Sequence, residues 1–589
     1  MSVESIITEN LDICTSAIKT KSASGRGSSN KLELYGIKKL RELILTLAVS
    51  GKLLPQEIDD EPALTYIETL QKEKNALIKE RNFRKSKLSS EIDVSGYKFE
   101  LPANWCWKRL GDLFFISSSS RVNKKDWQES GVPFYRAREI VQLARKGIAE
   151  DDLFISEELY QNLTKAGVYP EKKDIMVTGV GTIGVPYIVT SKDKFYFKDA
   201  SVLIIKSTDS LYAEYIELFM KSPFWINSIH EQSMGTTVHT LTIVRANEAH
   251  IAIPPLNEQK RIVKKVDELM ALCDQLESQT EASFEAHQIL VQSLLETLTN
   301  AKDADELNES WQRISQHFDV LFTTEDSIDQ LKQTILQLAV MGKLVKQDPN
   351  DEPASKLLER IAAEKELLVK DKKIKKQKPL PPISEDEKPF QLPSGWNWCR
   401  GESIADFIDP QPSHRTPPVV ENGVPYIGYT DINFDNGIDF NGARKVSANV
   451  LDEHRERYEL KMGDFVFGKI GTLGKPFFLT EPFEYCLSAN LILIQPRSNV
   501  VLPEFLASFL NSPVLYSMLE KKKTNSTHSV FGIKKARLLV IPLPPLCEQH
   551  RILVKLEVLN KICDELKRRV NTQISLKLKL ADSHLTASL

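Results

Sequence analysis

Hydrophobic residues recur at helical spacing in a segment that occurs twice along the chain. In the first copy the apolar residues lie three or four positions apart, at Leu40, Leu43, Ile44 and Leu47. This spacing predicts an amphipathic helix with one buried face. Gly51 follows where a helix C-cap is expected, and Gly342 occupies the same place in the second copy. Each copy therefore opens with a helix that ends at a glycine.

A longer helix with a heptad pattern is predicted at the end of each copy. Its apolar residues alternate by four and three positions, which averages 3.5 and describes a coiled-coil seam. The first seam is Ile262, Val266, Leu269, Cys273 and Leu276, and the second is Ile552, Leu556, Leu559, Cys563 and Leu566. A single seam cannot bury itself. We expect the two closing helices to form an intramolecular antiparallel coiled coil, with a helix of a partner protein as the alternative.

Short β-strand patterns fill about 150 residues between these helices in each copy. "DIMVTGVGTIGVPYIVT" (174–190) matches "DFVFGKIGTLGKPFFLT" (464–480), with apolar runs on both sides of a glycine turn. "AEYIELFMKSPFWINSI" (213–229) matches "PEFLASFLNSPVLYSML" (503–519) and is helical in pattern. We predict an α+β fold with two tandem domains of mixed α/β structure, separated by long helices and related by a pseudo-two-fold repeat.

The repeat period is about 290 residues, which is too long for a solenoid and indicates two copies of one large unit. "DEPA" (60–63 and 351–354), "LPxxWxW" (101–107 and 392–398) and "PPLxEQxxI" (254–262 and 544–552) recur in the same order. One departure is Cys547, which stands where Asn257 could cap the first closing helix. The predicted boundaries are a helical region and basic linker (1–100), a domain (101–254), a central helical region (255–391), a second domain (392–544) and a closing helix (545–589).

Composition narrows the class of protein. A chain of 589 residues with 41% hydrophobic residues is typical of a folded protein with three or four domains. No apolar run is long enough to span a membrane, and the first residues lack a signal-peptide pattern. Seven scattered cysteines without a CxxC pair favour a reducing cytoplasm over disulfides or zinc. The net charge of –3 neither supports nor excludes nucleic acid.

Two motifs resemble sequence motifs of enzymes but lack features that those enzymes require. "GVGTIG" (179–184) fits a dinucleotide-binding pattern, but a strand pattern follows it instead of the required helix, and the second copy has Lys469 opposite Gly179. A tight hairpin turn, or a turn that lets backbone approach a ligand, is the better interpretation. "IPPL" and "LPPL" resemble an adenine methyltransferase motif but lack its amide or carboxylate before Pro-Pro. We therefore interpret Pro-Pro as a stop before a helix whose Glu258 suits the N-terminus.

DNA-contact candidates lie in loops of the two middle segments. Hydroxyl groups and basic side chains there can donate to phosphates and base edges, and arginine suits guanine. A plain surface turn is the alternative for each, and the basic linkers (79–87 and 370–378) are either solvated or contact phosphate or a partner. The candidates are Arg136, Arg138, Thr178, Gly181, Thr182, Thr236, Thr237, His239, His414, Arg415, Tyr429, Lys469, Thr472, Lys523, Asn525, Thr527 and His528.

The doubled, ordered motifs resemble the specificity subunit of type I restriction–modification systems, in the branch with a long N-terminal lead. The resemblance covers nearly the whole chain. It implies a non-catalytic, cytoplasmic subunit whose two target-recognition domains each read one half of a bipartite double-stranded DNA site. It also implies two methyltransferase subunits and two restriction subunits as partners. S-adenosylmethionine, ATP and Mg²⁺ are expected in those partners, and no cofactor or metal in this chain.

The length of the paired seams suggests that the two closing helices fix the distance between the two half-sites. A seam of about 20 to 30 residues spans roughly 30 to 45 Å, and DNA advances about 34 Å per turn, so half-sites about one turn apart are expected. Two other classes of function stay open. A self-sufficient methyltransferase or nuclease would modify or cut DNA alone. A coiled-coil adaptor would show no salt-dependent DNA affinity.

Overall fold

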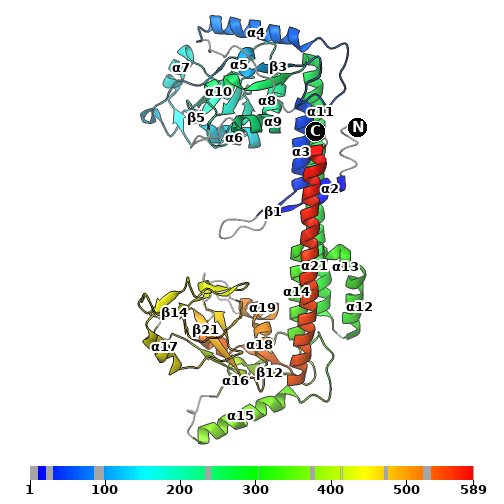
Figure 1. Ribbon diagram of the computed structural model, residues 1–589, viewed down its shortest axis with the longest axis vertical. Helices are drawn as coiled ribbons and strands as arrows, with labels where there is room; N and C mark the ends of the chain where they lie inside the picture. The colour runs from blue at the N-terminus through cyan, green and yellow to red at the C-terminus, as the bar shows by residue number, and fades with distance from the viewer. Residues whose placement is uncertain are drawn as a thin grey trace. The chain divides into compact units, whose positions relative to one another are not determined.

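The structure is a computed structural model of the chain (Figure 1). It divides into two compact units, described one at a time: unit 1 is Met1–Ser283 with Gln573–Leu589, and unit 2 is Phe284–Thr572. No described helix is both long and apolar enough to cross a membrane. The residues that the structure describes are 11–21, 31–84, 99–150, 152–231, 240–302, 304–371, 379–411, 413, 415–469, 475–521 and 532–587.

Helix α3 (Tyr35–Val49) is the opening helix of unit 1, as its apolar spacing predicts. Leu40 and Ile44 on its inner face are fully buried. The helix ends where the N–H of Lys52 donates to the carbonyl of Leu47 at 3.0 Å, and Gly51 has a φ of +73°. This is a Schellman cap, which confirms the predicted role of the glycine. The other helical and hairpin elements beside the β domain are α2 (Leu11–Ser16), β1 (Lys19–Lys21), β2 (Lys31–Glu33), α4 (Ala63–Glu80), α11 (Leu256–Asn300) up to Ser283, and α21 (Leu546–Ala587) from Gln573.

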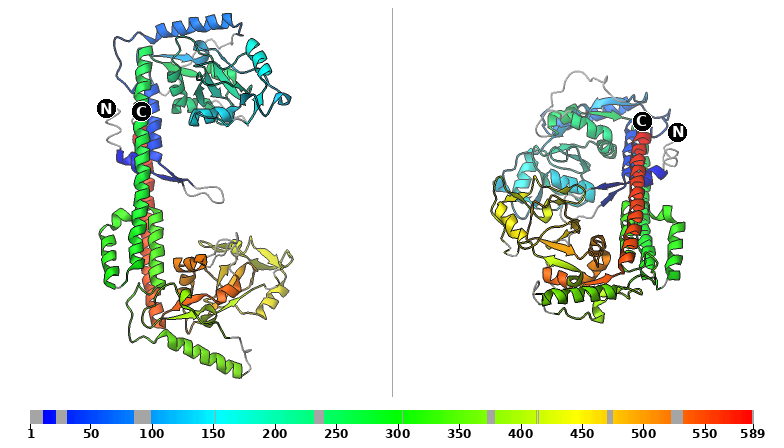
Figure 2. Two further views of the ribbon diagram at one scale, coloured as in Figure 1. Left: turned by 180° about the vertical axis from the view of Figure 1, so that it is seen from behind. Right: turned by 60° about the horizontal axis from the view of Figure 1, so that its bottom comes forward.

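The β domain of unit 1 contains two small sheets and a strand pair (Figure 2). One sheet is antiparallel with the order β4-β10-β7-β8, and in the other β5 lies between antiparallel β6 and parallel β9. Strands β3 and β11 pair, so the first and last strands of the domain are neighbours. The strands are β3 (Cys106–Arg109), β4 (Ile116–Ser117), β5 (Val132–Tyr135), β6 (Phe154–Ile155), β7 (Ile175–Thr178), β8 (Pro186–Ile188), β9 (Tyr196–Phe197), β10 (Val202–Ile205) and β11 (His250–Ile253). The helices are α5 (Leu110–Leu113), α6 (Ala137–Lys146), α7 (Glu157–Ala166), α8 (Ala213–Lys221), α9 (Pro223–Glu231) and α10 (Ile243–Glu248).

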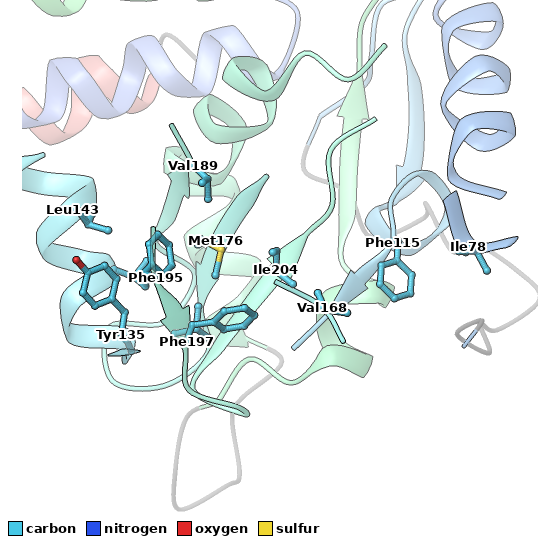
Figure 3. Close-up of a cluster of buried hydrophobic side chains, with 13 residues drawn as sticks. Ile78, Phe115, Tyr135, Leu143, Val168, Met176, Val189, Phe195, Phe197 and Ile204 are labelled. Carbon is cyan, nitrogen blue, oxygen red and sulfur yellow. The ribbon is translucent and has the colours of Figure 1, made fainter. Parts of the chain in front are cut away.

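An apolar cluster forms the core between these two sheets (Figure 3). Met176 of β7 and Ile204 of β10 lie at its centre, with Tyr135 and Phe197 of the second sheet on one side. Ile78 of α4 joins the cluster from outside the β domain. The core thus attaches the end of α4 to the domain that follows it.

Unit 2 repeats this plan. Helix α14 (Glu325–Val340) is the counterpart of α3, and it is followed by Gly342, with a φ of +74° and the same cap bond, from Lys343 to Leu338 at 2.9 Å. Its sheets have the orders β13-β21-β18-β19 and β17-β14-β20, and β12 pairs with β22. A short hairpin, β15–β16, has no counterpart among the strands described in unit 1. The other helices are α12 (Ala304–Gln316), α13 (Phe318–Leu321), α15 (Ala354–Lys370), α16 (Gly401–Ile404), α17 (Ala448–Arg455), α18 (Pro503–Leu510), α19 (Pro513–Lys521) and α20 (Ile533–Arg537). The strands are β12 (Asn397–Arg400), β13 (Ala405–Ile408), β14 (Val424–Ile427), β15 (Ile432–Asn433), β16 (Gly437–Ile438), β17 (Arg444–Val446), β18 (Phe465–Gly468), β19 (Phe477–Phe478), β20 (Cys486–Leu487), β21 (Leu491–Pro496) and β22 (Val540–Leu543).

The glycine motif at 179–184 lies in an antiparallel hairpin. Strand β7 pairs directly with β8, and Gly181 and Gly184 have φ values of +70° and +78°. The strand is therefore followed by a second strand and not by a helix, as the sequence pattern predicts. Mixed strands and helices in tandem domains agree with the predicted α+β fold.

Candidate nucleic-acid interface

A cluster of side-chain contacts connects the β domain of unit 1 to α11, and we call this cluster the joint. It brings together residues of the DEPA, LPxxWxW and PPLxEQxxI motifs. The indole N–H of Trp105 donates to Glu258 Oε2 at 3.0 Å, and Gln56 Nε2 donates to Glu258 Oε1 at 2.7 Å. Arg261, one turn further along α11, pairs with Asp60 of the DEPA segment through both of its terminal nitrogens. Burial raises the pKa of Glu258, and the two donors oppose that rise. The start of α11 is thereby tied to the first strand of the domain.

The same joint forms in unit 2. Gln347 Nε2 donates to Glu548 Oε1 at 3.1 Å, and Arg551 pairs with Asp351. Burial again raises the pKa of the glutamate. Trp396 lies near enough to favour the charged form of Glu548, but its buried indole N–H has no hydrogen-bond partner among the described residues. The two joints thus differ in one hydrogen bond.

Glycine and proline explain another part of the repeated motifs. A Cβ atom on Gly51 would lie 2.4 Å from Pro102 Cγ, and one on Gly342 would lie 2.5 Å from Pro393 Cγ. Each "LP" segment therefore packs against the glycine that ends the opening helix. The constant offset between the motifs was the available signal for this contact.

The N-capping role considered for Asn257 is not observed. Helix α11 begins at Leu256 and α21 at Leu546, so Asn257 and Cys547 both lie inside the first turn. A residue in the first turn does not occupy the N-cap position. The change to cysteine in the second copy therefore removes no cap.

The predicted seam residues are buried or half-buried, and ion pairs join the opening helix of each unit to a closing helix. In unit 1, Arg41 of α3 pairs with Asp274 and Glu277 of α11, at 2.7 and 2.8 Å. In unit 2, Lys332 of α14 pairs with Asp564 of α21 at 2.5 Å. The hydroxyl of Tyr35 on α3 also donates to Asp582 at 2.6 Å, in the part of α21 that belongs to unit 1. The seam residues Ile262, Val266, Leu269, Cys273, Ile552, Leu556 and Cys563 are buried, and Leu276, Leu559 and Leu566 are half-buried. The opening helices are partners that the heptad pattern did not reveal, and pairing of α11 with α21 stays a prediction.

The candidate DNA contacts of unit 1 that the structure describes lie in or beside loops at one end of its two sheets, and we call this set of loops the reading edge after the predicted role: 118–121, 136–138, 179–185 and 198–201. Backbone bonds hold these loops together, because Gly179 donates to the carbonyl of Ser201 at 2.8 Å and Lys198 donates to that of Tyr135 at 2.8 Å. Thr178 is buried, and its hydroxyl accepts from Val185 N–H at 2.9 Å, so it shapes the turn. Gly181 and Thr182 are exposed at the tip of the turn. Of these predicted contacts, the last two are placed for direct access.

Arg136 and Arg138 stand at this edge but are paired with carboxylates. Both guanidinium groups contact Glu139 at 2.8 Å, and Arg138 also pairs with Asp152. Glu139 is buried, and although burial opposes ionisation, the arginines and backbone donors hold its pKa below the usual value. The positive charge of these arginines is therefore partly neutralised in the free protein.

The reading edge of unit 2 occupies the same place in its fold: 409–411, 413, 415–417, 428–431, 469, 475 and 488–490. Lys469 donates its backbone N–H to Asn490 at 2.8 Å, the counterpart of the Gly179 bond. Its ammonium is buried against Asp409 at 2.9 Å and the carbonyl of Ala489 at 3.0 Å. The hydroxyl of Tyr429 accepts from Lys475 N–H at 2.8 Å. Lys469 and Tyr429 thus support the loops of this edge.

Among the predicted contacts, Arg415 is an exposed cation on the loop after β13. No ion pair or side-chain hydrogen bond of its guanidinium is recorded among the described residues. The remaining candidates lie outside the described residues: Thr236, Thr237, His239, His414, Thr472, Lys523, Asn525, Thr527 and His528. DNA contact by all of these residues stays a prediction.

Arg81 of the first basic linker pairs with Glu171 at 3.2 Å and lies over the ring of Tyr169, so this residue contacts its own β domain. Within the described part of the chain, no group of three or more histidine, cysteine, aspartate or glutamate side chains could hold a metal ion.

Comparison with known proteins identifies what the chain resembles. Residues 102–286 and 420–576 match the family described as the type I restriction modification DNA specificity domain. The chain is 38% identical to the type I restriction enzyme EcoEI specificity subunit of Escherichia coli, over 100% of both chains. It is 37% identical to the EcoAI specificity subunit of Escherichia coli, again over 100% of both. A crystal structure of the HsdS subunit from Thermoanaerobacter tengcongensis aligns with a TM-score of 0.40 at 18% identity, covering 84% of this chain and 99% of that one.

Proposed function

Because the chain belongs to the family of type I restriction–modification DNA specificity subunits, we propose that each of its β domains reads one half of a bipartite DNA target. Membership confirms the resemblance predicted from the doubled motifs. It also makes the chain the non-catalytic recognition component of its system, in agreement with the predicted absence of enzymatic activity. The two rival classes of function, a self-sufficient enzyme and an adaptor without DNA contact, are thereby set aside.

The observation that carries the proposal is the contrast within each unit. The joints at Glu258 and Glu548 share a glutamine donor and an arginine–aspartate pair. The reading edges share backbone bonds but carry different side chains, such as Gly179 and Lys469 at one position. A common frame with unlike edges suits two readers of different sequence. Base-edge contacts distinguish sequences, whereas backbone contacts only position a protein on DNA.

The proposal extends to domain limits and partners. We infer recognition domains at 101–254 and 392–544, helical regions at 1–100, 255–391 and 545–589, and docking of methyltransferase subunits on the helices. Those subunits supply S-adenosylmethionine, and two restriction subunits supply the ATP- and Mg²⁺-dependent steps. A base inside the duplex must leave the stack to be methylated, so base flipping belongs to the partner.

Exchange of a recognition domain tests the proposal. Residues 108–250 are replaced by the equivalent segment of a relative with another target, and the chain is expressed with its methyltransferase subunit. Single-molecule sequencing of methylated adenines is expected to show one half-site changed and the other half-site and the spacer kept. Exchange of 399–540 is the matched control and should change the opposite half. A change of both halves by one exchange, or an uninterrupted target, contradicts the proposal.

The helical regions are proposed to set the spacer. One heptad adds about 10 Å to a helix, whereas one base pair adds about 3.4 Å to DNA. Insertion of one heptad after Ala271 and after Ile562 is expected to lengthen the spacer of the methylated site while both half-sites stay the same. Insertion in α11 alone is the control, because it lengthens one of the two long helices by seven residues and leaves the other unchanged. An unchanged spacer after the double insertion refutes this part of the proposal.

A further inference from the structure

The reading edges carry arginines of two kinds, those paired with carboxylates and those exposed without a recorded ion pair among the described residues, and the second kind is Arg121 of unit 1 and Arg415 of unit 2. Arg136 and Arg138 of unit 1 share the carboxylate of Glu139, and Arg138 also binds Asp152. Arg415 of unit 2 is exposed and makes no recorded side-chain pair among the described residues. An unpaired guanidinium keeps its five donors for a ligand and loses no ion pair when it binds.

Two described residues of the same loop, Gln411 and Ser413, make hydrogen bonds with the backbone of Arg415. Gln411 Nε2 donates to Ser413 Oγ at 2.9 Å and, more weakly, to the carbonyl of Arg415 at 3.5 Å. The N–H of Arg415 donates to the same Ser413 oxygen at 3.4 Å. Gln411 therefore bridges the loop beside the arginine.

Gln411 is in turn fixed from the interior of the domain. Its Oε1 lies 2.7 Å from Nε2 of His454, which is 2% exposed on α17. Because an amide oxygen only accepts, Nε2 must carry the proton, and Nδ1 accepts from the hydroxyl of Tyr458 at 2.8 Å. Burial lowers the pKa of His454 to about 4, which keeps this neutral tautomer in place near pH 7.

Three further contacts brace the loop from its flanks. Arg457 donates to the carbonyls of Pro410 at 3.0 Å and Asp409 at 2.7 Å. Arg444 donates to the carbonyl of Pro417 at 3.1 Å. Such bracing is more than a flexible phosphate contact needs. A fork that meets two acceptors on one base edge does need a defined backbone.

We propose that Arg415 reads a guanine of the half-site bound by unit 2, through O6 and N7 in the major groove, and that Gln411 and His454 are positioning residues for it. The inference rests on the proposed function and deepens it. Among the bases, guanine presents two acceptors side by side in the major groove, which match the arginine fork. The edge of unit 1 also carries an exposed arginine, Arg121, but no amide held by a buried histidine is recorded beside it among the described residues.

The test uses the complete chain with its methyltransferase subunit. The complex methylates a DNA library randomised over the half-site of unit 2, and the modified molecules are sequenced. Arg415→Ala is expected to lower the preference for guanine at one position by about 10- to 100-fold and to leave the other half-site unchanged. Arg415→Lys keeps the charge but loses the fork, so it should lose most of the same preference while salt dependence stays the same.

The positioning residues have their own readout. Gln411→Ala and His454→Ala are expected to weaken the preference at the same position as Arg415→Ala, and His454→Gln, which retains an N–H donor, to restore part of it. Arg136→Ala is the matched control and should not alter that position. A merely structural role would lower methylation of every site equally.

Two results would overturn the inference. In one, Arg415→Ala leaves the preference at every position intact. In the other, it weakens binding to all sequences equally and reduces the salt slope by about one, which marks a phosphate contact. Failure of the proposed function would appear instead in the unaltered complex, as a methylated site without a separate half for unit 2.

Discussion

The joints and the reading edges of the two units have diverged to different degrees. At the joints, Glu258 and Glu548 bind a glutamine from the segment after the opening helix, and a DEPA aspartate binds an arginine one turn further on. At the edges, the backbone N–H groups of Gly179 and Lys469 make equivalent bonds, and Glu139 and Asp431 each accept from the N–H three residues before them. Most other side chains at the edges differ. Paired side chains therefore hold the orientation of each domain on its helix, while the edge can change its side chains without changing its backbone.

A buried carboxylate shows how such a change is tolerated. Asp174 and Asp464 precede equivalent strands, β7 and β18, and both are buried. Asp174 pairs with Lys206 at 2.5 Å, whereas Asp464 accepts from Gln495 at 2.5 Å. Burial raises the pKa of both aspartates, with these partners opposing the rise. The acceptor is retained and the donor is replaced, so the strand keeps its anchor while the local charge changes.

Removing one indole should disrupt the joint of its own unit and leave the other joint intact. Of the changes we predict, this one should lower the free energy of unfolding the most. Trp105→Ala and Trp396→Ala each empty a buried site and should destabilise their own unit by about 3 to 5 kcal/mol. Hydrogen exchange is measured at the β3–β11 ladder for the first variant and at the β12–β22 ladder for the second. Faster exchange in both ladders from a single substitution would show that the joints are not independent.

A pH titration should separate the units, because His454 has no buried histidine counterpart among the described residues of unit 1. Its pKa is lowered to about 4 from 6.5, so the unfolded state binds the proton first as pH falls. Unit 2 should therefore lose about 3 kcal/mol of stability between pH 6.5 and pH 4, and no more from this group below pH 4.

The measurement is hydrogen exchange at β14 and β20, corrected for the intrinsic effect of pH. The His454→Gln variant is the control, since the raised pKa values of Glu548 and Asp464 affect it and the unaltered chain alike. An equal pH response of the two chains would show that His454 is not buried in the neutral form.

The helices and the hairpin could be predicted because their signals are local. The spacing of Leu40, Leu43 and Leu47 defines a buried face, and Gly51 and Gly181 occupy conformations that side chains disfavour. In the sequence, the residues of the joints were recognisable only as repeated motifs, which did not indicate which residues contact one another. Glu258 suited a helix N-terminus by charge alone, and its partners lie 153 and 202 residues away in the chain.

The reading edges could not be predicted in detail, because their pairings depend on loop geometry. Lys469 was a natural candidate for DNA, yet the fold buries it against Asp409. Gln411 and His454 carried no motif, and the charged neighbours of His454 in "LDEHRER" (451–457) gave no sign of its burial. Their contact joins residues 43 positions apart, through a loop whose path no periodic pattern defines.

The smallest effect tests the one hydrogen bond that distinguishes the joints. Trp105→Phe removes the donor to Glu258, and Trp396→Phe removes an N–H that has no partner among the described residues. Both substitutions leave a cavity of similar size, so the destabilisation caused by the cavity is about the same in the two variants. Trp105→Phe should therefore destabilise unit 1 by about 1 to 2 kcal/mol more than Trp396→Phe destabilises unit 2. Hydrogen exchange at the two ladders measures the difference, and equal losses would mean that both indoles bind their glutamates alike.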